Sequence, residues 1–298
     1  MLSMSRMISL KAEDAIDRLN ILRLQEDGDY ATIDILKSDK EVFRWRGKMR
    51  GWTCQIVEYY EFDRQVIAVA LSIFDRFVSK HSCREKKIQL VSMSSLYIAV
   101  KLYEGHNHNL TAVTLASLSR GLFSVNDIIV MEKVILELLS WKVHPPTASC
   151  FIRDFFVLAP TSISQEMKNA MSEFSCYLID LALCENAFLE FQPSTLAFAS
   201  ILNSIRWVDS DCYPDHVDKF FSSQIEFAIG KRFSDADVQK SMLMLQDVYA
   251  MSPGYRFNHV TILMNPFEDE PLKPNIGSEK QFKNNFQATA GRHHSLRR

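Results

Sequence analysis

The hydrophobic pattern of this chain is organised around the stretch from Ile88 to Glu104, which reads IQLVSMSSLYIAVKLYE. Apolar residues fall on almost every side of the helix predicted here, which is typical of a helix buried in the middle of a helical domain. Its serines and Ala99 are small, so neighbouring helices can approach closely. Lys101 and Glu104 interrupt the pattern only at the C-terminal end, where a cation complements the free carbonyl groups of the last turn.

A second predicted helix, from Asp127 to Trp141, carries a charge in an unusual position. Its sequence DIIVMEKVILELLSW has an apolar stripe that includes Ile128 and Leu136, and Glu132 lies four residues from each of them. Charges in buried positions are rarely left unpaired. Either Glu132 and Lys101 pair with each other, or both face a surface that a partner covers.

Helical periodicity recurs along most of the chain. An N-terminal helix is predicted through Ile16, Leu19 and Leu22 and ends near Gly28. Two runs of five helices follow. The first run is predicted at 49–60, 63–77, 88–104, 111–122 and 124–141, and the second at 147–156, 164–184, 193–207, 214–230 and 234–251. The two runs have similar apolar centres, which favours an internal duplication.

This pattern divides the chain into four parts. Residues 1–41 form an N-terminal extension with a helix, 42–146 a first helical domain, 147–260 a second, and 261–298 a polar tail that we expect to be disordered. Ser124 and Thr147 are predicted N-caps, and Asp63 a third. The tail ends in the basic sequence RHHSLRR, which is a candidate for phosphorylation or nuclear import.

Composition narrows the class of protein and its compartment. The formal charge of −2 over 298 residues gives no basic field for nucleic acid. The six cysteines form no CxxC pair and fall mostly in apolar helices, which favours reduced thiols in the nucleus or cytoplasm. No apolar run is long enough to cross a membrane. The opening residues are too weakly apolar for a secretory signal, and Arg6 alone gives little support for a mitochondrial presequence.

The sequence contains no arrangement of residues that indicates catalysis. There is no glycine-rich phosphate loop, no HExxH, no zinc-type cluster and no Gly-x-Ser-x-Gly. His106 and His108 form a His-x-His pair without a nearby thiol, and we do not expect them to bind metal. We therefore predict a protein with no cofactor, no metal site and no catalytic activity of its own.

Four short motifs in one order resemble the cyclin box of cyclins, the regulatory subunits of cyclin-dependent kinases. They are Met49-Arg50-Gly51-Trp52, LSIFDRFVS from Leu71, the central stretch from Ile88, and MEKVILELLSWKVHPPT from Met131. The resemblance is clear from about Val42 to Phe156 and looser up to about Ser252. It implies an all-α fold of two tandem five-helix cyclin domains, a kinase partner and a role in cell-cycle progression.

The resemblance also implies a binding site for the kinase. In cyclins, a lysine that ends the third helix and a glutamate of the fifth contact the mobile C-helix of the kinase, and these positions match Lys101 and Glu132. The implied kinase-binding residues are Lys101, Leu102, Glu132, Trp141 and Val143. For Trp141 and Val143, ordinary packing under the linker remains an alternative.

A second implied surface is the groove in which cyclins dock substrate peptides that carry an Arg-x-Leu motif. The matching positions are Met49, Trp52, Thr53, Ile56 and Gln89. The family usually has a leucine at the position of Thr53, a tryptophan at that of Ile56 and an acid at that of Tyr59. The groove is therefore degenerate, and we expect docking of such peptides to be altered or absent.

Two sequence signals of particular cyclin types are missing. The N-terminal region has no Arg-x-x-Leu destruction signal and no Leu-x-Cys-x-Glu signature. The linker with HPPT is nearer to divergent or D-type cell-cycle cyclins than to transcriptional ones. The main alternative function is that of a transcription-associated factor, because type-B basal factors and transcriptional cyclins use the same paired fold. That alternative predicts a basic stripe across both domains, which the sequence does not have.

Overall fold

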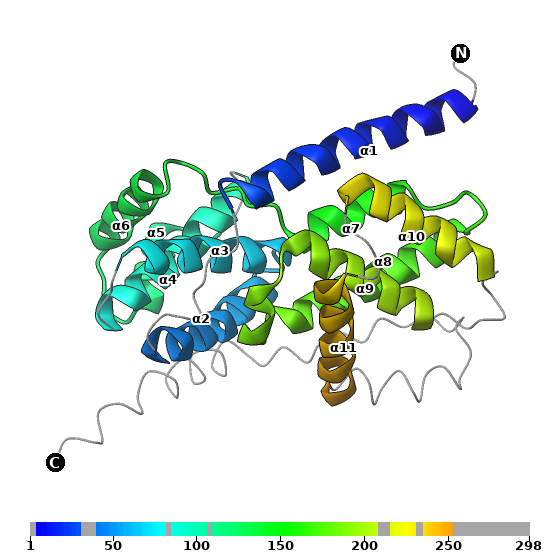
Figure 1. Cartoon of the computed structure of the whole chain (residues 1–298). Helices are drawn as coiled ribbons and strands as arrows, with labels where there is room; N and C mark the ends of the chain where they lie inside the picture. The colour runs from blue at the N-terminus through cyan, green and yellow to red at the C-terminus, as the bar shows by residue number, and fades with distance from the viewer. Residues whose placement is uncertain are drawn as a thin grey trace.

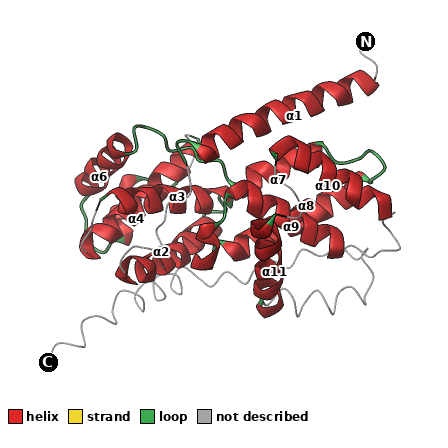
Figure 2. Cartoon of the chain, in the orientation of Figure 1, coloured by secondary structure: helices red, strands yellow, loops and turns green. Residues whose placement is uncertain are grey.

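The computed structural model of the chain is all-α over the residues that it describes, which are 4–30, 40–81, 85–105, 109–207, 215–230 and 235–252. One helix precedes two groups of five, which lie side by side (Figures 1 and 2). The predicted fold of two tandem five-helix domains with an N-terminal helix is confirmed. The predicted tail lies outside the described residues.

The first domain consists of α2 (Lys40–Tyr59), α3 (Gln65–Lys80), α4 (Glu85–Tyr103), α5 (Ala112–Leu118) and α6 (Val125–Leu138). Helix α2 begins at Lys40, nine residues before the predicted start at Met49. Trp45 and Arg46 explain the difference, because both are buried in the extra turns and join α2 to the core. The predicted N-cap Asp63 lies one residue before the observed N-cap, Arg64, which makes no side-chain cap hydrogen bond. The Asp63 carboxylate still accepts a hydrogen bond from the amide of Gln65, the first helical residue, at 2.8 Å.

Helix α4 lies at the centre of this domain, as its all-round apolar pattern predicts. Ser92, Ser94 and Ser95 are buried on it. The hydroxyl of Ser92 donates to the carbonyl of Ile88 within the helix, and that of Ser94 donates to the carbonyl of Ile128 on α6 at 3.4 Å. Small side chains thus let α4 and α6 approach closely enough for direct contact with backbone.

The second domain consists of α7 (Ala148–Val157), α8 (Gln165–Ala182), α9 (Pro193–Trp207), α10 (Asp215–Ile229) and α11 (Ala236–Met251), with a short 3₁₀ turn at Asn186–Glu190. Helix α9 is the counterpart of α4, and its residues from Ser194 to Ile205 are almost all buried. The predicted caps are confirmed at Ser124, whose hydroxyl accepts from the amide of Asp127, and at Thr147, which accepts from the amide of Cys150.

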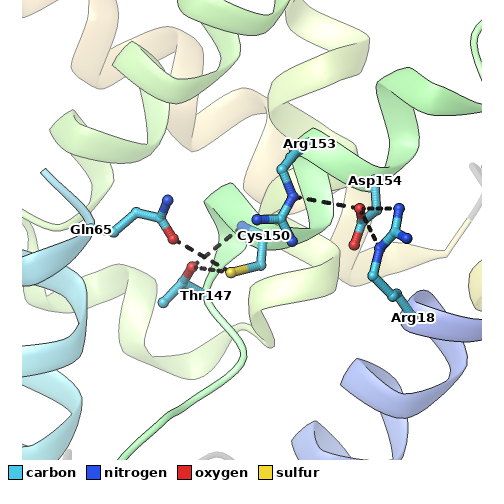
Figure 3. A network of polar contacts seen from close by, with 6 residues as sticks. All are labelled: Arg18, Gln65, Thr147, Cys150, Arg153 and Asp154. Atoms are coloured by element: carbon cyan, nitrogen blue, oxygen red, sulfur yellow. Dashed lines mark hydrogen bonds and ion pairs between the residues drawn. The ribbon is translucent and has the colours of Figure 1, made fainter. Parts of the chain in front are cut away.

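Helix α1 (Met4–Asp27) precedes the first domain in sequence but packs on the second (Figure 1). Leu19 is fully buried in the core of the second domain. Beside it, the guanidinium of Arg18 donates to the buried carboxylate of Asp154 on α7 at 3.0 Å (Figure 3). Further along α1, the carboxylate of Glu26 accepts hydrogen bonds from the amide and the hydroxyl of Ser194 at 2.7 and 2.6 Å.

We expect Glu26→Ala to lower the free energy of unfolding by about 2 kcal/mol, because it leaves the buried amide and hydroxyl of Ser194 without their acceptor. Chemical denaturation followed by circular dichroism measures this change. The matched control is Asp27→Ala, which removes an exposed carboxylate that accepts from Gln192 and should cost about 0.5 kcal/mol or less. Equal effects of the two substitutions would contradict the assigned role of Glu26.

The end of α1 also reaches the linker between the domains. Asp29 forms an ion pair with Lys142, and the hydroxyl of Tyr30 accepts from the amide of His144 at 3.1 Å. The Tyr30 ring lies 4.4 Å from the guanidinium carbon of Arg76 on α3. One short segment therefore contacts α3, the linker and, through Glu26, the second domain.

Two ion pairs join neighbouring elements. One links α2 to α3, and the other links the residue before α3 to α8. Arg46 and Asp75 are both buried, with the guanidinium Nε 2.9 Å from one carboxylate oxygen, and Arg46 also donates to the side-chain carbonyl of Asn186 at 3.0 Å. Arg64 pairs with Asp180 at 2.5 Å. Asp75 on α3 therefore lies buried against α2, although it is a charged residue within an apolar helix.

The described cysteines Cys54, Cys150, Cys176 and Cys184 are free, as their apolar positions predict. Burial raises the pKa of Cys54 and Cys176 to about 11. At pH 8 we therefore expect these thiols to be alkylated by iodoacetamide about 100-fold more slowly in the folded chain than in the same chain in urea. Peptide mass spectrometry over a time course measures both rates, and a ratio near one would contradict the expected protection.

Candidate functional site

Lys101 and Glu132 meet on the surface of the first domain. Lys101 is in the last turn of α4 and Glu132 is in the middle of α6, and their side chains form an ion pair. The Lys101 ammonium also lies 4.4 Å from the centre of the Tyr97 ring. The Lys101 side chain is 37% exposed and that of Glu132 is 16% exposed. The two charges thus pair with each other and still remain accessible to a partner.

A capping box at the start of α6 fixes the register that places Glu132. The amide of Ser124 donates to the Asp127 carboxylate at 2.8 Å, and the amide of Asp127 donates to the Ser124 hydroxyl at 3.1 Å. Hydrogen bonds from Ser124 lower the pKa of the Asp127 carboxyl group. From this start, Ile128, Met131 and Ile135 point into the core and Glu132 emerges beside α4.

The remaining residues of the predicted kinase site divide into exposed and buried ones. Leu102 is 41% exposed next to Lys101, and Trp141 is 69% exposed. Val143 is buried in the core of the first domain, so it is not part of the exposed surface. For Val143 the structure therefore agrees with packing under the linker, whereas Trp141 faces solvent.

The backbone holds Trp141 outward. Ser140 and Trp141 have φ angles of +52° and +61°, a left-handed conformation that is costly for residues with a Cβ atom. The Trp141 amide donates to the carbonyl of Leu136 at 2.8 Å, which ends α6 with this turn. A left-handed residue commonly follows the last turn of a helix, and here this end of α6 leaves the Trp141 ring in solvent.

Sequence reasoning did not identify three exposed aliphatic residues on α6. Ile129, Val130 and Val134 are 50%, 52% and 37% exposed. The sequence does contain a pattern that indicates them, because DIIVMEKV has more apolar residues than one buried stripe requires. Ile129 is three residues before Glu132 and is its neighbour on the helix, whereas Val130 and Val134 are each two residues from Glu132 and face away from it.

The residues predicted for the peptide-docking groove lie mostly inside the domain. Met49, Thr53 and Ile56 on α2 are buried, and Trp52 and Gln89 are half-buried. A peptide that approached this face would meet Trp52 and Gln89 before any of the other three. This arrangement is consistent with a degenerate groove, and the docking of peptides there remains a prediction.

The described residues contain no group of three or more histidine, cysteine or acidic side chains that is arranged to hold a metal ion. His106 and His108 lie outside the described residues. Among the helices that the structure describes, none is both long enough and apolar enough to span a membrane.

The architecture of the chain is two tandem five-helix domains with an N-terminal helix on the second. Family models identify the class of protein by sequence: the cyclin N-terminal domain matches residues 17–144, and the cyclin C-terminal domain matches residues 146–260. The chain belongs to the cyclin family.

Individual relatives agree with this assignment. The chain is 30% identical to Cyclin-G1 of Sus scrofa over 152 residues, which cover 51% of this chain and 52% of that protein. It is 25% identical to Cyclin-A3-1 of Oryza sativa subsp. japonica, over 75% of this chain and 60% of the relative. The match thus spans about half the length of the first of these relatives. Among solved structures, a viral cyclin from herpesvirus saimiri superposes with a TM-score of 0.60 at 18% identity, over 79% of this chain and 98% of the viral protein.

Proposed function

We propose that this protein is the regulatory subunit of a cyclin-dependent protein kinase, that it binds and activates the kinase, and that it has no catalytic activity of its own. The observation that carries the proposal is the accessible Lys101–Glu132 ion pair beside the exposed side chains of Leu102 and Trp141. An apolar surface with one cation and one anion suits a partner helix, because the charges can hold polar groups of that helix while the apolar residues bury its side chains.

The mechanism follows from differential binding. A kinase has an inactive and an active arrangement of its C-helix, and the active one requires an ion pair between a lysine and a glutamate of the kinase. A partner that binds the active arrangement more tightly shifts the population toward it by the difference in affinity. In this proposal, the α4–α6 surface supplies that difference and the second domain holds the first in place.

The experiment is a pull-down with the purified chain from a lysate of its own cells, followed by a histone kinase assay on the eluate. Recovery of a cyclin-dependent kinase whose activity rises with added chain supports the proposal. If the folded chain recovers no kinase, or a kinase that it does not activate, the proposal is wrong. The eluate should also be tested for nucleic acid and basal transcription components, since these are the partners of the alternative transcription-associated function.

We further propose a reducing compartment, the nucleus or the cytoplasm, in keeping with the four free thiols among the described residues. Fractionation of cells with an antibody to the chain tests this location. The same fractions, compared through the division cycle, also test the proposed link to cell-cycle progression.

A further inference from the structure

A cavity of about 190 Å³ lies between the two domains. Helix α3, the linker, the end of α8 and the 3₁₀ turn at Asn186–Glu190 all contribute to its wall. Most of the lining is apolar and includes Leu71, Pro145, Ile179 and Phe188. The cavity is separate from the Lys101–Glu132 surface, and none of the residues predicted for the kinase site or the docking groove lines it.

Arg76 gives this apolar cavity a charged group. Its side chain lines the wall and the residue is only 6% exposed. One guanidinium nitrogen donates to the carbonyl of Lys142 at 2.5 Å, and the group lies over the Tyr30 ring. No acidic side chain of the described residues forms an ion pair with it. Burial lowers the pKa of Arg76, and the nearby Tyr30 and Asp29 act in the opposite direction. Asp29 itself forms its ion pair with Lys142, so no ion pair offsets the cost of burying the Arg76 cation.

The other ionisable groups of the wall do not supply this counter-ion. Asp75 is already occupied, because both of its carboxylate oxygens accept from Nε of Arg46 at 2.9 and 3.0 Å. Glu185 is exposed. Ala148 and Ser149, which begin α7, also line the cavity, and the amides of a first helical turn favour an anion.

We propose that this cavity is a binding site for a small apolar carboxylate, whose charged group pairs with Arg76 and whose apolar body fills the space between the domains. The size supports such a ligand, because a cavity of about 150 Å³ is enough to hold benzene. The inference does not depend on kinase binding, since the cavity is lined by other residues than those predicted for the kinase site.

The test is a fluorine NMR titration of the full chain with two probes of nearly the same shape, 4-fluorophenylacetate and 4-fluorophenylacetamide. The carboxylate is expected to bind with a Kd of about 1 mM or tighter, as suits a ligand of about ten non-hydrogen atoms. The neutral amide should bind at least about tenfold more weakly, because a hydrogen bond to a charged acceptor is stronger than one to a neutral acceptor. Equal affinities, or no saturable binding below about 10 mM, would overturn the proposal.

Two variants locate the site. Arg76→Met should remove the preference for the carboxylate while the amide still binds, and a preference that survives this change would overturn the proposal. Ala68→Leu is a second variant, which keeps Arg76. The larger side chain fills the cavity from α3 and should lower the affinity for both probes at least about tenfold. Its matched control is Ala250→Leu on the exposed face of α11, which should leave both affinities unchanged. Undiminished binding to Ala68→Leu would place the probes elsewhere and exclude this cavity.

Discussion

The double variant Lys101→Ala/Glu132→Ala is expected to lose affinity for the kinase by about 30- to 150-fold, or 2–3 kcal/mol. The reason is that both side chains are accessible in the free protein and become desolvated under the partner helix, where their removal leaves polar groups of the kinase without partners. A quantitative binding assay with the kinase recovered in the pull-down measures the loss. The activity of that kinase should fall in parallel, because activation follows binding.

The folded state of the double variant should change little. The pair is partly solvated, and exposed ion pairs contribute about 1 kcal/mol or less to stability. A matched control is Lys240→Ala/Glu190→Ala, which removes another partly exposed lysine–glutamate pair, at 2.8 Å, on the second domain. Undiminished kinase binding by the Lys101/Glu132 variant, or an equal loss in the control, would mean that the binding site lies elsewhere.

Asp75→Ala is expected to destabilise the protein by about 3–5 kcal/mol, the largest effect on stability that we predict. Arg46 is 3% exposed, and its guanidinium would lose both carboxylate contacts while it stays buried. Burial raises the pKa of Asp75 even with Arg46 beside it, which shows how strongly this site disfavours an isolated charge. Urea denaturation measures the change in the free energy of unfolding.

The double substitution Arg46→Met/Asp75→Leu separates the ion pair from the burial of a lone charge. It should restore most of the stability that Asp75→Ala loses, because well-packed apolar residues often replace a buried ion pair at little cost. Asp180→Ala is the control at a more exposed pair and should cost about 1 kcal/mol or less. If the double variant were less stable than Asp75→Ala, the pair itself would be the main source of stability.

Sequence reasoning found the helices of both domains and the position of Lys101 and Glu132, because both follow from local pattern. The apolar periodicity of α4 and α6 has to match their burial, and a charge on an apolar stripe is visible without coordinates. The partner of Asp75 was not predictable in this way. Asp75 and Arg46 are 29 residues apart, and only the packing of α2 on α3 brings them together.

The exposure of Trp141 was likewise not predictable from the sequence. Its neighbours Ser140 and Lys142 give no turn signal such as glycine or asparagine, yet the backbone turns left-handed at Ser140 and Trp141. The choice between a buried and an exposed tryptophan depends on that turn. The burial of Met49, Thr53 and Ile56 is similarly a product of how α2 packs, which a comparison of motifs does not reveal.

The docking of α1 on the second domain has a consequence for synthesis on the ribosome. The residues of α1 leave the ribosome first, but Asp154 on α7 and Ser194 on α9, to which they bind, come more than 100 residues later, and α11 ends more than 200 residues later. At about 5–20 residues per second, the helix waits roughly 10–40 s before its binding site is complete. During that interval Leu19 and Glu26 have no partner domain, so the first segment made is among the last to reach its final position.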